Sequence, residues 1–63
     1  MTFELVERGD RLIVSAPFNH RWKVWARENG GKWDAGSMAW VFRVEQREAV
    51  EEALERIFEE DEA

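Results

Sequence analysis

The sequence predicts one α+β domain in which four strands and two helices follow in the order ββαββα. Three observations predict this class. Short apolar runs with turn signals between them occupy the start and the middle of the chain, a Gly-Gly pair ends a first helical stretch, and the last segment carries an apolar stripe at helical spacing. A chain of 63 residues has room for one hydrophobic core. We therefore expect residues 1–63 to form a single antiparallel sheet with both helices packed on it, and residues 60–63 to fray.

The first two elements are predicted to be a β-hairpin. Residues 3–6 and 11–14 are apolar runs with β-branched side chains. Gly9-Asp10 between them provides the backbone freedom that a tight turn requires. Pro17 follows and has no amide hydrogen for a strand ladder, so the second strand is expected to end before it.

The third element is predicted to be a helix from about His20 to Asn29. Asn19 is a suitable N-cap, and Phe18 precedes it. Gly30-Gly31 is a strong stop signal, because glycine adopts the left-handed conformation that closes a helix. The side chains at helical spacing are those of Phe18, Trp22, Trp25, Ala26 and Asn29.

A second pair of strands is expected at residues 32–34 and 39–42, with Asp34 closing an Asx-type turn between them. Alternation places Trp40 and Phe42 on one side of their strand, and both are expected to face the core. Trp33 is expected to point inward with them, because a small domain without disulfides spends its aromatic side chains on its core.

The last helix is predicted from Glu45 to about Glu60. This segment contains no Gly or Pro, and residues that favour helices dominate it. Its apolar stripe consists of Val50, Ala53, Leu54, Ile57 and Phe58.

Composition argues against catalysis and against a bound metal or cofactor. The chain has no Cys, and its one histidine, His20, has no nucleophile and orienting group placed near it by any motif. Gly30-Gly31 follows a helix, whereas a phosphate-binding glycine loop precedes one. The chain starts without the features of a signal peptide and has no apolar run of about 20 residues. We therefore expect a cytoplasmic, monomeric binding protein that is not an enzyme and has no membrane contact.

Charge is distributed unevenly along the chain. Through Val44, five acidic residues accompany seven basic ones, whereas from Glu45 onward nine acidic residues accompany only Arg47 and Arg56. The first part therefore carries a net charge of about +2 and the last part about −7. Such asymmetry within one chain is a clue to its partner.

The last helix is predicted to display a ridge of carboxylates opposite its apolar stripe. At 100° per residue, the side chains that point away from the stripe are those of Glu45, Glu48, Glu52, Glu55 and Glu59. Regularly spaced carboxylates can face a basic groove as a phosphate backbone does, with electrostatic steering. The alternative is a solvated helix face that keeps a small protein soluble.

The first helix offers a different surface, suited to nucleic acid. An exposed Trp25 would stack on unpaired bases while basic side chains hold phosphates. The residues of this alternative site are Arg21, Lys23, Trp25, Arg27 and Lys32.

Residues 18–34, followed by Met38-Ala39-Trp40-Val41-Phe42, resemble small bacterial and phage modules. Their shared pattern is a lysine, an alanine, glycine-glycine or glycine-alanine, a basic residue, Trp-Asp, and then a second Trp followed by apolar residues. A looser similarity is to the HARP domain found beside DNA-remodelling helicases. The resemblance covers about the middle third of the chain and implies a nucleic-acid context. The acidic helix that follows departs from a DNA-binding role.

In its size and acidity the chain also resembles phage-encoded anti-CRISPR inhibitors. This resemblance implies nucleic-acid mimicry: the acidic ridge would block the DNA-binding surface of a basic protein, such as a CRISPR effector subunit. Direct nucleic-acid binding through the first helix is the alternative function, and an interaction domain without nucleic acid, such as half of a homodimer, is the third.

Overall fold

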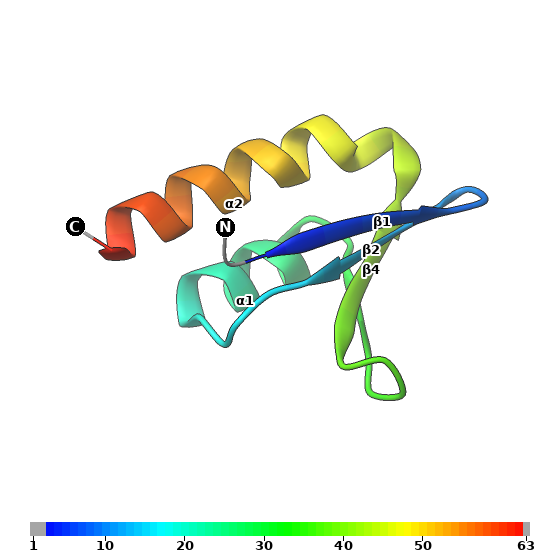
Figure 1. Cartoon of the computed structure of the whole chain (residues 1–63), viewed down its shortest axis with the longest axis horizontal. Helices are drawn as coiled ribbons and strands as arrows, with labels where there is room; N and C mark the ends of the chain where they lie inside the picture. Colours follow the sequence, from blue (N-terminus) through cyan, green and yellow to red (C-terminus); the bar gives the residue numbers. More distant parts are fainter. Residues whose placement is uncertain (1–2, 63) are drawn as a thin grey trace.

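The structure, a computed structural model, describes residues 3–62 of the chain, with side chains through residue 60. It has the predicted α+β class and the predicted ββαββα order (Figure 1). The elements are β1 (Glu4–Arg8), β2 (Arg11–Ser15), α1 (His20–Glu28), β3 (Lys32–Asp34), β4 (Ala39–Arg43), the short 3-10 helix η1 (Val44–Gln46) and α2 (Arg47–Glu62).

The four strands form one antiparallel sheet in the order β1-β2-β4-β3. After β2, helix α1 connects to β3, which forms an edge of the sheet. Strand β4 then lies between β2 and β3. The register places Leu12 opposite Phe42 and Val14 opposite Trp40. These four side chains therefore share one face of the sheet.

Local signals in the sequence account for the turns and the start of α1. Gly9, with a φ of 62°, begins the two-residue turn between β1 and β2. Asn19 caps α1, since its Oδ1 accepts a hydrogen bond from the Trp22 N–H at 3.1 Å. Gly30 follows α1 with a φ of 82°, as expected for a glycine that closes a helix.

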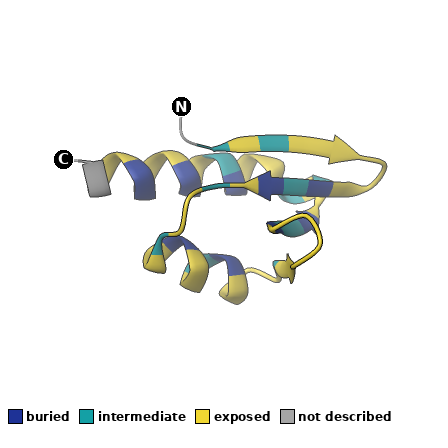
Figure 2. Ribbon diagram, turned by 60° about the horizontal axis from the view of Figure 1, so that its bottom comes forward, coloured by how far each residue is buried: buried dark blue, intermediate teal, exposed yellow. Residues whose placement is uncertain are grey.

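Both helices pack on the same face of the sheet. Figure 2 shows buried positions along one side of each helix. The expected apolar stripe of α2 is buried in full, together with Trp22 and Ala26 from α1. The core cluster consists of Leu12, Val14, Trp22, Ala26, Phe42, Val50, Ala53, Leu54, Ile57 and Phe58.

The last helical segment begins differently from the prediction. Instead of one helix from Glu45, the 3-10 helix η1 precedes α2. Gln46 explains this start, because its side chain accepts from the Arg43 N–H at 3.3 Å and donates to the Asn29 carbonyl at 2.8 Å. Helix α2 continues through Glu62, Ala63 lies outside the described residues, and fraying of residues 60–63 stays a prediction.

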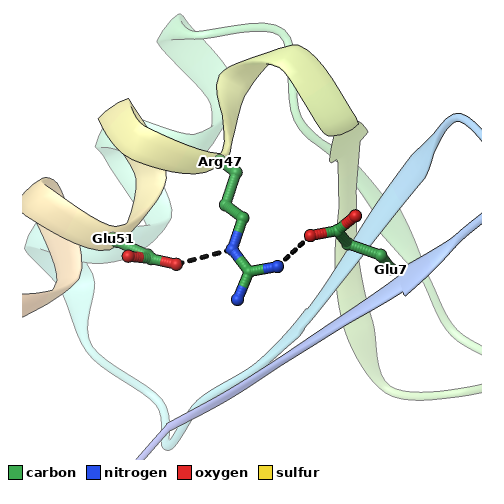
Figure 3. Close-up of polar contacts among 3 residues, drawn as sticks. All are labelled: Glu7, Arg47 and Glu51. Atoms are coloured by element: carbon green, nitrogen blue, oxygen red, sulfur yellow. Dashed lines mark hydrogen bonds and ion pairs between the residues drawn. The ribbon is translucent and has the colours of Figure 1, made fainter.

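Arg47 ties the start of α2 to the edge of the sheet. Its guanidinium forms an ion pair with Glu7 of β1 and donates from Nε to Glu51 Oε1 at 2.7 Å (Figure 3). The first contact joins residues 40 positions apart in the chain, and the second lies within α2. These exposed contacts link the start of α2 to β1, while the buried stripe of α2 holds the helix on the sheet.

Two predictions about aromatic side chains are corrected. Trp33 was expected in the core but is 52% exposed, and Phe18, expected on the helix stripe, is 84% exposed. Trp33 is paired with Trp40 and lies on the same, helix-facing side of the sheet. However, β3 is a three-residue edge strand that the helices do not cover. Phe18 has no apolar partner one turn into α1, because Lys23 occupies that position. Trp40 is partly buried against the core, as expected.

Candidate functional site

A groove of about 600 Å³ lies beside α1, between the loop after β2 and the β3–β4 turn. In Figure 1 that loop and that turn both lie at the bottom of the view, whereas α2 lies at the top. The groove is lined by Ala16, Pro17, Phe18, Asn19, Trp22, Lys23, Arg27, Trp33, Met38 and Trp40. No carboxylate is among these lining residues.

Three large apolar side chains of the groove are exposed to solvent. Phe18 comes from the loop before α1, Trp33 from edge strand β3, and Met38 from the end of the β3–β4 turn. Met38 is 73% exposed and has a φ of 53°, an uncommon backbone conformation for a residue with a side chain. Large apolar side chains gathered around one concavity are typical of a binding site.

Asp34 holds the turn that presents Met38. Its Oδ1 accepts from the Gly36 N–H at 3.2 Å, and its Oδ2 accepts from the Ser37 hydroxyl at 2.7 Å. The Asx-type turn predicted from the sequence is therefore confirmed. These two bonds order the turn, so the groove wall on this side is built before any ligand binds.

The floor of the groove is a stack of aromatic rings. The Trp22 ring, 2% exposed, stacks on Trp25 with centroids 5.6 Å apart and is tilted against Phe42 at 5.8 Å. Trp40 packs edge-on to Trp33, with centroids 5.6 Å apart. The Trp22 indole N–H is buried and has no acceptor among the described residues. These contacts hold the rings in fixed orientations.

Lys23 and Arg27 form the basic rim of the groove. They lie four residues apart on α1, which places them on neighbouring turns of one helix face. Both side chains are exposed, and among the described side chains neither forms an ion pair. The groove therefore combines apolar walls with two cations that are free to meet an anionic ligand.

The structure brings only part of the predicted nucleic-acid site into this groove. Lys23 and Arg27 line it, whereas Trp25 is partly buried beneath Trp22. Arg21 pairs with Glu60 of α2 at 2.7 Å, and Lys32 lies opposite Val41, away from the groove side of the sheet.

Sequence reasoning missed the three exposed apolar side chains of the groove. Two signals were available: Lys23 deprives Phe18 of its apolar partner on α1, and a three-residue strand at a sheet edge covers little surface. For Met38 the sequence alone holds no such signal.

The predicted acidic ridge is exposed along its whole length. The side chains of Glu45, Glu48, Glu52, Glu55 and Glu59 are all exposed, although Glu45 lies in η1 and the others in α2. Among the described side chains none of the five forms an ion pair; the paired glutamates of α2 are Glu51 and Glu60. The ridge is on the side of α2 opposite the buried stripe, and no residue of α2 lines the groove.

The described side chains contain no group of three or more His, Cys, Asp or Glu residues that could hold a metal ion. His20 is exposed at the first position of α1. None of the described helices is long and apolar enough to cross a membrane.

No protein-family model, curated protein or solved structure matches this chain.

Proposed function

We propose that the chain is a non-catalytic binding module whose groove holds a short stretch of single-stranded nucleic acid. Bases stack against Trp33 and Phe18, and the phosphates between them contact Lys23 and Arg27. The observation that carries this proposal is the gathering of Phe18, Trp33 and Met38, all exposed, around one groove with a basic rim.

The exposure of Phe18, Trp33 and Met38 lowers the stability of the fold, and a binding role explains why these side chains are exposed. A domain of 63 residues buries a modest fraction of its surface, so every large apolar side chain outside the core is stabilisation forgone. Of the five large apolar side chains that are exposed among the described residues, three, those of Phe18, Trp33 and Met38, share one concave surface.

The geometry favours stacking on aromatic rings over a purely apolar ligand. The edge contact with Trp40 holds the Trp33 ring, so little side-chain entropy is lost when a base stacks on it. Each base–aromatic stack contributes about 1–3 kcal/mol. Lys23 and Arg27 add a salt-dependent attraction to phosphates, which an uncharged apolar ligand does not use.

The net charge of −5 is compatible with an anionic ligand because the acidic side chains lie away from the groove. The exposed glutamates of the ridge are on the outer side of α2, and no carboxylate lines the groove. At physiological ionic strength the screening length is about 8 Å, so the field at the groove is governed by nearby charges.

The double variant Phe18→Ala/Trp33→Ala tests this proposal. We expect its affinity for a labelled oligothymidine of about 15 nucleotides to fall at least about 30-fold, since two stacking partners are lost. Fluorescence anisotropy at low salt measures the affinity, and thermal unfolding checks that the fold persists. Val24→Ala, which removes another exposed apolar side chain from α1, is the matched control and should bind like the wild type. Equal binding by the double variant and the control would overturn the proposal.

A second candidate function rests on the acidic ridge. Its five exposed glutamates have no ion-pair partner among the described side chains, and their regular spacing on a helix resembles a row of phosphates. In this case the chain is an inhibitor of anti-CRISPR type that occupies the DNA-binding surface of a basic protein. Binding would be strongly weakened by salt.

The triple variant Glu48→Gln/Glu52→Gln/Glu55→Gln tests the ridge. Tagged protein is used to capture partners from nuclease-treated lysate at low and at high salt. If the ridge is the inhibitory surface, the wild type captures a basic nucleic-acid-binding protein at low salt and the variant does not. Glu4→Gln/Asp10→Asn/Glu28→Gln makes the same change in net charge away from the ridge and should still capture it. Identical capture by both triple variants contradicts this function.

A further inference from the structure

The sheet has a second face, turned away from both helices, that carries a row of arginines. Arg8 lies opposite Arg11, and Arg11 lies opposite Arg43, so three neighbouring strands place an arginine at the same level. Each is next in sequence to a residue of the helix-facing side, such as Leu12 or Phe42. Alternation therefore directs the three guanidinium groups to the open face.

The arginines of this row have no ion-pair partner among the side chains that the structure describes. Adjacent strands are about 4.8 Å apart, so the three arginines are spread over roughly 10 Å. Like charges placed directly opposite each other destabilise a sheet. All three side chains are exposed, and among the described side chains none forms an ion pair.

The acidic strand residues of this face lie at its other end, whereas Asp10 of the β1–β2 turn lies at the arginine end. Glu4 is four residues from Arg8 along β1, about 13 Å away, and Asp34 is at the corresponding end of β3. Between them and the arginines runs a level formed by Val6, Ile13, Val41 and Lys32. Lys32, which the groove does not use, thus extends the positive charge of the open face.

We propose that this open face, defined by Arg8, Arg11, Arg43 and Lys32, is a contact surface for the phosphate backbone of double-stranded nucleic acid. Arginine matches phosphate geometry through two parallel hydrogen bonds. The face presents aliphatic Val6 in place of aromatic rings, so it has no platform on which unpaired bases stack. Backbone contact to a paired duplex is the chemistry that remains.

The acidic ridge on α2 affects the side from which a polyanion approaches the protein. Helix α2 packs on the opposite side of the sheet, and its exposed glutamates point away from the sheet. The molecule therefore has a positive and a negative side, and a polyanion is steered to the open face. This inference is independent of the groove, because none of the four residues lines it.

The triple variant Arg8→Gln/Arg11→Gln/Arg43→Gln tests the inference. Anisotropy of a labelled 20-base-pair DNA duplex is followed across a salt series. The slope of log K against log salt is about −0.9 per phosphate contact, so losing three contacts should make the slope less steep by about 2.7. If the two proteins bind equally at 1 M salt, this corresponds to an affinity loss of about 500-fold at 0.1 M salt. The fold is expected to persist, with an unchanged or higher Tm, because like-charge repulsion is removed.

A matched variant separates the arginine row from net charge. Arg21→Gln/Arg47→Gln/Arg56→Gln removes the same number of positive charges from the helices and leaves both the row and the groove intact. It should bind the duplex like the wild type, and thermal unfolding checks that its fold persists. Equal duplex affinity of the row variant and the wild type overturns the inference. So do equal losses in both triple variants, absence of duplex binding by the wild type at 50 mM salt, or competition by polyglutamate as effective as that by unlabelled duplex.

Discussion

Leu54→Ala is expected to lower the free energy of unfolding by about 2–5 kcal/mol, the usual range for a buried leucine. Leu54 is fully buried and lies in the middle of the α2 stripe that packs on the sheet. A domain of this size has a total stability of roughly 3–9 kcal/mol at about 0.05–0.15 kcal/mol per residue. The substitution therefore removes a large part of the stability and leaves a substantial unfolded population.

Urea unfolding followed by far-UV circular dichroism measures this effect. Arg56→Ala is the control, since it shortens an exposed side chain two positions away on the same helix and should change stability by less than about 0.5 kcal/mol. A Leu54→Ala midpoint indistinguishable from that of Arg56→Ala contradicts the packing of α2 on the sheet.

Gly31→Ala is expected to destabilise the fold by about 1–3 kcal/mol through overpacking. A Cβ at this position would lie 2.7 Å from two ring atoms of Phe42 and 2.8 Å from the Ala26 carbonyl oxygen. Phe42 is buried against Trp22 and Trp25, so its ring has little room to turn aside. The Ala26 oxygen belongs to the backbone of α1 and accepts the Gly31 N–H at 2.8 Å.

The same addition of one methyl group at Gly36 provides the control. A Cβ there meets only Asp34 Oδ1, at 3.5 Å, an ordinary contact in an exposed turn. Differential scanning calorimetry should show a clear decrease in Tm for Gly31→Ala and almost none for Gly36→Ala. Equal melting temperatures for the two variants mean that the close approach of Gly31 to the Phe42 ring and the Ala26 carbonyl is wrong.

The elements that sequence reasoning predicted are those with local causes. The Asn19 cap, the Gly9 turn and the Asp34 turn each depend on hydrogen bonds or backbone angles within about three residues. The α2 stripe depends only on helical periodicity. The start of α2 was missed because part of its cause is distant: Gln46 accepts from Arg43, three residues earlier, but also donates to Asn29, which is 17 residues earlier.

The candidate site was predictable only in part, for a related reason. Lys23 and Arg27 follow from their spacing on one helix, and both line the groove. Trp33 was assigned to the core because a small domain uses its aromatic rings there, and Phe18 was placed on the helix stripe by its spacing. Whether an aromatic ring is covered depends on how far the helices extend over the sheet. That extent is a property of packing and not of the local sequence.

By itself the sequence determined the α+β class, the six main elements, the buried face of α2 and the exposed row of glutamates opposite it. Each of these follows from periodicity or from a cap or turn residue, which act over a few positions. Only the tertiary structure decided that β4 lies between β2 and β3, and this order aligns Arg11 with Arg43 and leaves Trp33 at an edge. The alternation of side chains along a strand predicts which of them share a face. Strand order and register, however, depend on the packing of the whole core.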